Sequence, residues 1–543
     1  MSRSRTSSRS DGMGIRPGKS GKRWLVSWLV VALSGASVSL TPIGLAGGPA
    51  PQQQPMGDLG PGCATDRPAI SHHAGGAKAD PGNKTAPVPC ISKPGYRTGE
   101  VSIAVTNSGN ILFRPAWDPQ ISGPSGGIIR SADRSASWDA PNSSANDNNM
   151  WVDRTTGRAF WIAGAGRLEI SDDDGRTWYP GGRVLNFDHR QIFGGPATAN
   201  LKNQLHGYPN VVYACVGHYP YKCQKSLDGG MTWGPELDVP YPREVASIQG
   251  PAHDCSAFGM QGVVDKDGTV YVPYTPCNRP YVAISHDEGG SWQTVEVGNT
   301  DLFGVGNLSL GIDAQDNLYA AWIVTSDRMP YLATSRDHGM HWGTPLMIGA
   351  PGINEAALAQ LVAGASGQVA VAYYASKNAT IPFPANCFPI TPGPRNRAAT
   401  PAAAPQARAP VPTPSCPGSE NELWDTYVTE SWNALDAQPL FWSAAMNAPS
   451  EPTWYGCSPM YTGVTRWDEN FTAGPGFTRG CYPGLTLDYF GAAMSPDNTP
   501  WIGFAQACPI GKTLPGNPNA NCPSPASGQG GLFALIGRLV ARE

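Results

Sequence analysis

The sequence has few charged side chains, no long helical pattern and none of the short motifs of nucleotide enzymes. Asp, Glu, Lys and Arg make up only 15% of the 543 residues, and no extended run combines helical periodicity with good helix formers. There is no P-loop and no dinucleotide fingerprint in a strand–turn–helix setting. A Cys-x-x-Cys pair is also missing, which weakens any cysteine-based metal site. These absences argue against a helical protein and against a nucleotide-binding enzyme.

Residues that form turns and strands are abundant instead. The chain contains 65 Gly, 53 Pro, 17 Trp and 19 Tyr. Many turn formers together with many aromatic residues are typical of short strands joined by tight loops. The composition therefore predicts an all-β protein.

The first 46 residues have the pattern of an export signal. Seven basic residues precede the apolar stretch 24–33, and Gly44-Leu45-Ala46 offers small residues at a cleavage site. An uncleaved N-terminal anchor is the alternative, although the apolar stretch is short for a membrane span. We therefore expect a secreted, extracytoplasmic protein that contacts a membrane only through an uncleaved signal segment.

The charge of the remaining chain argues against a nucleic-acid partner. Removing residues 1–46 takes away seven basic side chains and one acidic one, so 31 Lys and Arg then face 41 Asp and Glu. A chain with this acidic balance binds a phosphate backbone poorly. We expect neither a nucleic acid nor a nucleotide as partner.

The cysteines indicate an oxidising compartment. There are twelve, an even number, and they lie in the sequence as neighbours. Such a pattern outside the cytosol favours local disulfides, although spacing alone does not fix the pairing. The pairs that we hypothesise are Cys63/Cys90, Cys215/Cys223, Cys255/Cys277, Cys387/Cys416, Cys457/Cys481 and Cys508/Cys522.

One short motif, Ser-x-Asp-x-Gly-x-Thr-Trp, recurs along the chain. Residues 171–178 and 226–233 match it fully, 285–292 replace Thr by Ser, 335–342 replace Thr by His, and 131–138 lack the Gly. The motifs start 40 to 59 residues apart, which is the spacing expected of propeller blades. In each motif, Gly provides positive φ at a hairpin tip, and the Asp carboxylate accepts hydrogen bonds from the turn. We expect a structural role for these Asp residues.

Each motif ends a longer unit of apolar strands, and two later units lack the motif. We count seven units, which predicts a single β-propeller of seven four-stranded blades; six blades is the alternative if the first and last units share one blade. The Gly/Pro/Gln-rich residues 47–95 look like a flexible linker, and the propeller would span 96–543. Two insertions, near 378–418 and 509–530, have the composition of disordered loops.

The repeated motif resembles the boxes of the sialidase-like Asp-box (BNR repeat) β-propeller superfamily. In sialidases the resemblance implies three arginines that grip a substrate carboxylate, a Tyr nucleophile supported by a Glu, and an Asp acid/base. The sequence departs from this pattern, because the nearest counterpart of the Arg-Ile-Pro motif is Phe113-Arg114-Pro115, on the second strand of its unit. No catalytic residue can be carried over by motif.

Candidate site residues lie just before the first strand of each unit, because those loops converge on one face of the ring near its axis. A glycosidase needs a proton donor and a nucleophile or base. The catalytic candidates are Asp254 and Asp188 as carboxylates, and Tyr489 as a nucleophile beside Glu355. The substrate-binding candidates are Arg190, for an anionic sugar group, with His189, His253 and Asp488.

These residues also have a purely structural interpretation. Asp488 and Asp188 could cap strand starts, while His189 and His253 could satisfy backbone groups. Asp147 and Asp153, which we place close to the start of the second unit, extend the list of polar candidates on the axial face.

Two functions remain open from the sequence. One is a secreted carbohydrate-active protein of the sialidase superfamily, such as an exo-glycosidase, that hydrolyses or recognises a glycan at the axial face. The other is a non-catalytic propeller that binds a protein or a cell-surface polymer. We expect no cofactor and no metal site, since no His-x-x-x-His spacing exists, although a structural calcium ion is compatible with such a fold.

Overall fold

The computed structural model describes most of the chain after residue 61. The described residues are 62–98, 101–115, 127–140, 149–163, 166–186, 190–216, 221–242, 260–299, 308–379, 422–455, 491–507, 513–514, 517–521 and 532–540. Within them, regular structure is almost entirely β, with only the short 3-10 turns η1 (Ala74–Gly76), η4 (Lys202–Gln204) and η5 (Pro276–Asn278). None of the described segments forms a helix long and apolar enough to span a bilayer.

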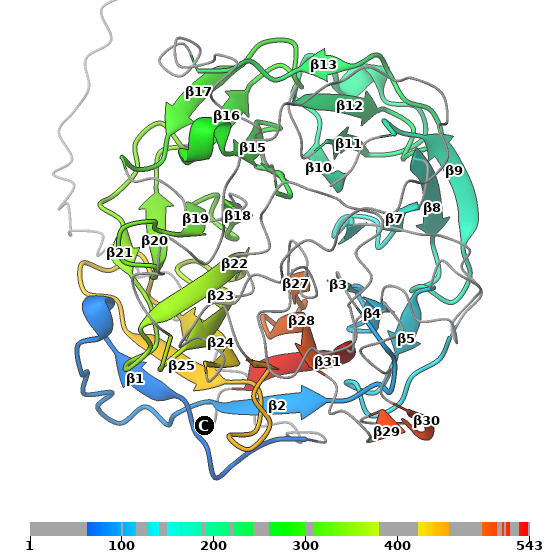
Figure 1. The fold of residues 1–543 in the computed structure, drawn as a ribbon. Coiled ribbons are helices and arrows are strands. Elements are labelled where there is room, and N and C mark those ends of the chain that lie inside the picture. The colour runs from blue at the N-terminus through cyan, green and yellow to red at the C-terminus, as the bar shows by residue number, and fades with distance from the viewer. Residues whose placement is uncertain are drawn as a thin grey trace, which may run out of the picture. The chain divides into compact units, whose positions relative to one another are not determined.

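Seven antiparallel sheets are arranged as the blades of a propeller (Figure 1). Blade 1 contains β3 (Val101–Val105), β4 (Ile111–Pro115) and β5 (Ile129–Ser131). Blade 2 contains β6 (Met150–Val152), β7 (Ala159–Ala163), β8 (Arg167–Ser171) and β9 (Tyr179–Arg183). Blade 3 contains β10 (Gln191–Pro196), β11 (Asn210–Cys215), β12 (Lys222–Ser226) and β13 (Leu237–Asp238). Blade 4 contains β14 (Val263–Val264), β15 (Val270–Tyr274), β16 (Tyr281–Ser285) and β17 (Gln293–Glu296).

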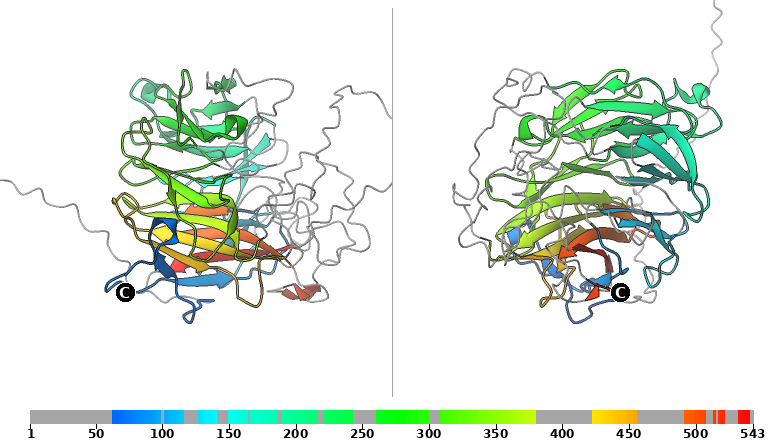
Figure 2. Two further views of the ribbon diagram at one scale, coloured as in Figure 1. Left: turned by 60° about the vertical axis from the view of Figure 1, so that its left-hand side comes forward. Right: turned by 45° about the vertical axis from the view of Figure 1, so that its right-hand side comes forward.

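The last three blades follow the same order, with additions. Blade 5 contains β18 (Ser309–Ile312), β19 (Leu318–Ile323), β20 (Pro330–Ser335) and β21 (Leu346–Met347). Blade 6 contains β22 (Glu355–Ala363), β23 (Val369–Ser376), β24 (Leu423–Ser431) and β25 (Phe441–Ala445), with β1 (Ile70–His72) and β26 (Trp454–Tyr455) added. Blade 7 contains β27 (Gly491–Met494), β28 (Pro500–Ala507), β31 (Leu532–Val540) and β2 (Val88–Ser92). A separate hairpin of β29 (Thr513–Leu514) and β30 (Asn517–Asn521) lies outside the blades (Figure 2). The all-β, seven-bladed prediction is confirmed.

The ring closes in a way that the sequence did not reveal. Strand β2 pairs with β31 as the outermost strand of blade 7, and β1 pairs with β25 at the edge of blade 6. The first and last units therefore do not share a blade, and the six-blade alternative is wrong. The prediction of a flexible linker is also wrong for residues 62–92, called here the N-terminal segment. Its Gly- and Pro-rich composition conceals two short strands whose ladder hydrogen bonds come from existing blades.

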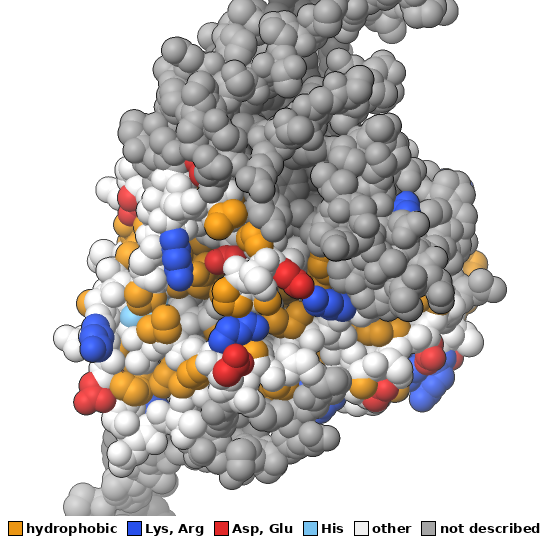
Figure 3. Space-filling model, turned by 60° about the horizontal axis from the view of Figure 1, so that its bottom comes forward, with side chains coloured by type: hydrophobic (Ala, Val, Ile, Leu, Met, Phe, Trp, Pro, Cys, Tyr) orange, Lys and Arg blue, Asp and Glu red, His pale blue; other side chains and the backbone are white. Residues whose placement is uncertain are grey.

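Several further contacts attach the N-terminal segment to the propeller. The predicted Cys63–Cys90 disulfide is present and joins the start of the segment to β2. Arg67 Nη1 donates a hydrogen bond to the carbonyl of Asn447 at 2.6 Å, on the blade 6 side. On the outer face over this region, hydrophobic side chains lie among Lys, Arg, Asp and Glu (Figure 3). The segment is thus an integral part of blades 6 and 7.

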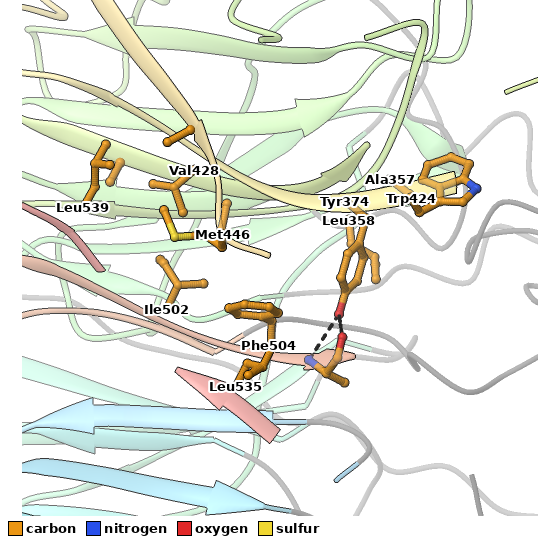
Figure 4. Packing of buried hydrophobic residues seen from close by; sticks show 14 of the residues in the cluster. Ala357, Leu358, Tyr374, Trp424, Val428, Met446, Ile502, Phe504, Leu535 and Leu539 are labelled. Carbon is orange, nitrogen blue, oxygen red and sulfur yellow. Dashed lines mark hydrogen bonds between the residues drawn. The ribbon is translucent and has the colours of Figure 1, made fainter. Parts of the chain in front are cut away.

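The hydrophobic core is divided into clusters, each between two neighbouring blades. The cluster between blades 6 and 7 includes Trp424, Val428, Met446 and Phe504 (Figure 4). Within it, the Tyr374 hydroxyl donates to the carbonyl of Ala505 at 3.2 Å, so that the cluster also joins the two blades through a polar contact. Because each blade buries both of its faces against neighbours, no blade has a complete core of its own.

The repeated motif forms the hydrogen-bonded turn expected from its residues. In the copy of blade 2, Asp173 accepts hydrogen bonds from the Thr177 backbone N–H at 2.8 Å and from its hydroxyl at 2.6 Å. Ser171 Oγ donates to the same carboxylate and accepts from Gly175 N–H, each at 2.9 Å. Gly175 has φ 77°, and Ser135, which replaces this glycine in the first copy, has φ 70°. The turn conformation is therefore kept even where the glycine is lost.

A second predicted disulfide, Cys215–Cys223, joins β11 to β12, and Cys277 is disulfide-bonded as well. The other hypothesised pairs lie wholly outside the described residues, and so does Cys255. Disulfides of this kind are typical of proteins outside the cytosol.

Candidate functional site

Two of the eight predicted site residues, Glu355 and Arg190, fall within the described chain. The other six lie outside the described residues and stay predictions, as does Asp147. They are Asp188, His189, His253, Asp254, Asp488 and Tyr489.

Glu355 is the first residue of β22, the innermost strand of blade 6 (Figure 1). The backbone on both sides of it is fixed: Asn354 N–H donates to the carbonyl of Ser376 at 2.8 Å, and Ala356 N–H donates to the carbonyl of Arg328 at 2.7 Å. Arg328 lies in the turn between β19 and β20 of blade 5 and has φ 60°. Glu355 is thus held at the boundary of blades 5 and 6.

The Glu355 carboxyl group is enclosed and lies near two other ionisable side chains. Its side chain is 0% exposed, and among the described residues neither carboxyl oxygen has a hydrogen-bond partner. Arg328 Nη1 is 3.8 Å from Oε1, a separation too long for a strong hydrogen bond. Burial raises the pKa of Glu355 to about 8; the Arg328 charge opposes this shift, and the neighbouring Glu422 adds to it. The carboxyl group is therefore mainly protonated at neutral pH.

Glu422 and Arg328 complete what we call the Glu355 cluster. Glu422 is buried and directly precedes β24, so it enters the cluster from the far end of the insertion between β23 and β24. Neither residue is among those predicted from the sequence. The only sequence signal for Glu422 is its position at the end of the Pro/Ala-rich stretch, and Arg328 gives none. Two carboxyl groups and one guanidinium group provide a proton donor, a second acid and a cation.

Arg190 precedes β10, the innermost strand of blade 3, and its side chain is buried. Its Nη1 donates to Asn186 Oδ1 at 3.4 Å. The adjacent Gln191 accepts a hydrogen bond from Asn149, which precedes β6 in blade 2. Arg190 lies in blade 3, whereas the Glu355 cluster lies at the boundary of blades 5 and 6. The two candidates thus belong to different parts of the ring.

Asp153 does not belong to this face. It follows β6 at the end opposite the start of the strand, where its carboxylate accepts from the Tyr208 hydroxyl at 2.5 Å and from Asn210 Nδ2 at 2.9 Å. Both partners belong to the blade 3 side, so Asp153 joins neighbouring blades. Asp265 and Asp313 occupy the same turn in blades 4 and 5, and each accepts from a buried Tyr hydroxyl. The earlier placement of Asp153 near the axial loops is therefore corrected.

Among the described residues, no group of three or more His, Cys, Asp or Glu side chains is arranged to hold a metal ion. A structural calcium ion stays a prediction.

Comparisons with known proteins do not identify the chain. No family model matches it, and no curated protein matches it. One similar structure is a protein of unknown function from Dyadobacter fermentans, with a TM-score of 0.37 and 12% identity, covering 85% of this chain and 100% of the other. The NanB sialidase of Streptococcus pneumoniae has a TM-score of 0.35 and 11% identity, covering 83% of this chain and 70% of the sialidase.

A third similar structure is a GH74 xyloglucanase from Xanthomonas campestris, with a TM-score of 0.35 and 16% identity. The match covers 58% of this chain and 55% of the xyloglucanase. The chain is a seven-bladed β-propeller, and its place in the sialidase-like superfamily stays a prediction.

Proposed function

We propose that this protein is a secreted, carbohydrate-active β-propeller that hydrolyses a glycan at the face where the innermost strands begin. The observation that carries the proposal is the state of Glu355: a carboxyl group at the start of β22, buried, with a pKa raised to about 8, beside Glu422 and Arg328. A proton donor in glycoside hydrolysis must keep its proton at the working pH, and burial is the usual means of achieving this.

The remaining candidates supply the other parts that such a reaction needs. In this proposal Asp188, Asp254 or Tyr489 provides the second catalytic group, while Arg190 binds an anionic group of the sugar. His189, His253 and Asp488 contribute further hydrogen bonds to the glycan. In the sequence all of these residues lie just before the first strand of a unit, and Glu355 is the first residue of such a strand.

The test is turnover of 4-methylumbelliferyl glycosides, a sialoside among them, by the purified protein and by Glu355→Gln. We expect one glycoside to be hydrolysed, and Glu355→Gln to lower kcat by about 10²- to 10⁴-fold, the usual contribution of general acid catalysis. Glu430→Gln is the matched control: Glu430 is also buried in blade 6 with a pKa raised to about 8, but it lies near the opposite end of β24. Equal losses in both variants would contradict a catalytic role for Glu355.

A non-catalytic function is the second candidate, and one observation favours it. Both oxygens of Glu355 are fully buried, so that a substrate could reach them only after the atoms that cover them move. If no glycoside is hydrolysed by the folded protein, binding to a glycan array would support a propeller that recognises a cell-surface polymer. Activity on any glycoside that is lost in Glu355→Gln would reject this candidate.

A further inference from the structure

A continuous chain of hydrogen-bonded side chains runs across four adjacent strands of blade 6, from β1 through β25 and β24 to β23. His72 Nε2, on β1, lies 2.7 Å from Ser443 Oγ on β25. Ser443 Oγ lies 2.6 Å from Thr429 Oγ1 on β24, and Thr429 Oγ1 lies 2.7 Å from the hydroxyl of Tyr373 on β23. The chain ends at the backbone N–H of Ala350, which donates to the Tyr373 hydroxyl at 2.9 Å.

The proton positions along this chain follow from its two ends. The carbonyl of His73, 3.0 Å from His72 Nδ1, can only accept, so Nδ1 carries the proton and Nε2 accepts from Ser443. Ser443 has one proton and must then accept from Thr429, which in turn accepts from Tyr373. The Tyr373 oxygen is left to accept from Ala350. Every hydroxyl proton is used once, and the chain has a single direction.

All four side chains are buried, so a break in the chain leaves a donor without a partner in the core. The exposed fractions of His72, Ser443, Thr429 and Tyr373 are all 2% or less. An unsatisfied buried donor is costly, and the surrounding structure is expected to shift in order to satisfy it. A substitution at one end of the hydrogen-bonded chain should therefore alter the hydrogen bonding at its other end.

The two ends of the chain have different roles in the fold. His72 belongs to the N-terminal segment, which is added to the edge of blade 6. Ala350 lies on the segment that leads directly to Glu355, called here the approach segment (residues 350–355). The approach segment is also held by Asn354, whose Nδ2 donates to the carbonyl of Ala379 at 2.8 Å. The chain thus links the N-terminal segment to the backbone that presents Glu355.

We propose that His72 is a positioning residue, which fixes the approach segment through Ser443, Thr429 and Tyr373 and thereby couples docking of the N-terminal segment to the geometry of the Glu355 cluster. The link to catalysis rests on the proposed function, whereas the coupling itself does not. No sequence pattern indicates this role, because His72 lies in a stretch with the composition of a linker. The N-terminal segment would then help to set the geometry of the Glu355 cluster.

The coupling is tested by hydrogen exchange of the Ala350 amide in the full protein. Thr429→Val removes one hydroxyl with little change of shape, and His72→Phe keeps a ring that can stack on Phe441 but cannot accept from Ser443. We expect both variants to accelerate exchange at Ala350 about tenfold, the effect of one lost hydrogen bond. Thr429→Ser should restore the wild-type rate. Ser71→Ala, on the same strand but outside the chain, should leave it unchanged.

A purely local role of His72 gives a different result. In that case His72→Phe would accelerate exchange only in the β1–β25 ladder, and Ala350 would keep its wild-type rate, which would overturn the proposal. If His72→Phe fails to fold, an unchanged exchange rate of the Ala350 amide in Thr429→Val would overturn the proposal. Where a hydrolysed glycoside is found, the variants should lower kcat more than they raise KM. Accelerated exchange without activity on any glycoside would reject the proposed function and leave the coupling intact.

Discussion

Replacement of Glu430 by Gln is expected to stabilise the protein at alkaline pH and to change little at pH 5. Glu430 is fully buried in β24; its Oε1 accepts from Gln368 Nε2 at 3.0 Å, and among the described residues Oε2 has no hydrogen-bond partner. Burial raises the pKa of this carboxyl group from 4.5 to about 8, while the bond from Gln368 lowers it only in part. A Gln side chain has the same shape and keeps the acceptor oxygen, but it does not ionise.

The direction of the pH dependence follows from the raised pKa. Between pH 4.5 and about 8 the folded state holds a proton that the unfolded state has lost. The stability linked to this proton is fully present below pH 4.5 and is lost as the pH rises through about 8. Each pKa unit corresponds to 1.36 kcal/mol, so ionisation of Glu430 costs at most about 5 kcal/mol of folding free energy.

Urea unfolding of the wild-type protein and Glu430→Gln at pH 5, 7 and 8.5 measures this effect. The difference in free energy of unfolding between the two should grow with pH in favour of the variant. Glu355, whose pKa is also raised to about 8, contributes the same pH dependence to both proteins and cancels in the difference. A difference that stays constant from pH 5 to 8.5 would refute the reasoning.

Three further stability predictions concern the turns and the N-terminal segment. Asp173→Ala removes three hydrogen bonds within the blade 2 turn and should lower the free energy of unfolding by about 1–2 kcal/mol. A urea titration measures this loss, and activity should be unchanged. Unchanged stability would show that the turn does not need the Asp173 carboxylate. Ser135→Gly relieves a side chain at φ 70° and should raise the melting temperature, by the equivalent of about 0.5–1 kcal/mol, whereas a lower melting temperature would contradict strain at this position. Replacing Cys63 and Cys90 together by Ser removes a disulfide between residues 27 apart and should cost about 3.5 kcal/mol of unfolding free energy, measured against the oxidised wild-type protein; equal stability of the two proteins would contradict a stabilising role of this disulfide.

The blades could be predicted because their signals are local. The repeated motif contains all the residues that form its turn. The apolar strands and short turns that precede it predict the hairpins of blades 2 to 5. In blade 4, strands β14 to β16 come before the motif of residues 285–292, as expected of a unit of apolar strands that ends in the motif. Even without the motif, blades 6 and 7 are recognisable from long β-branched and aromatic stretches such as β23.

The closing strands could not be predicted, because their partners are far away in the sequence. β2 is stabilised by β31, more than 400 residues later, and no local pattern encodes such a pairing. His72 illustrates the same limit: in the sequence it is one of two histidines in a linker-like stretch, yet in the structure it is buried against β25.

The candidate site was predicted only in part, for a related reason. Glu355 could be proposed because the start of an innermost strand is a recognisable position. Its neighbours Arg328 and Glu422 come from another blade and from the far side of an insertion, so that only the folded ring brings them together. Asp153 was misplaced because strand β6 is only three residues long, so that residues before and after this strand are close together in the sequence.

The central claim, that Glu355 is a proton donor in glycan hydrolysis, is tested most directly by the pH dependence of kcat/KM on a hydrolysed glycoside. A general acid with a pKa of about 8 requires kcat/KM to fall tenfold for each pH unit above that value. This alkaline limb should be absent from the residual activity of Glu355→Gln and unchanged in Glu430→Gln. An alkaline limb that persists in Glu355→Gln would contradict the account and assign the proton to another residue.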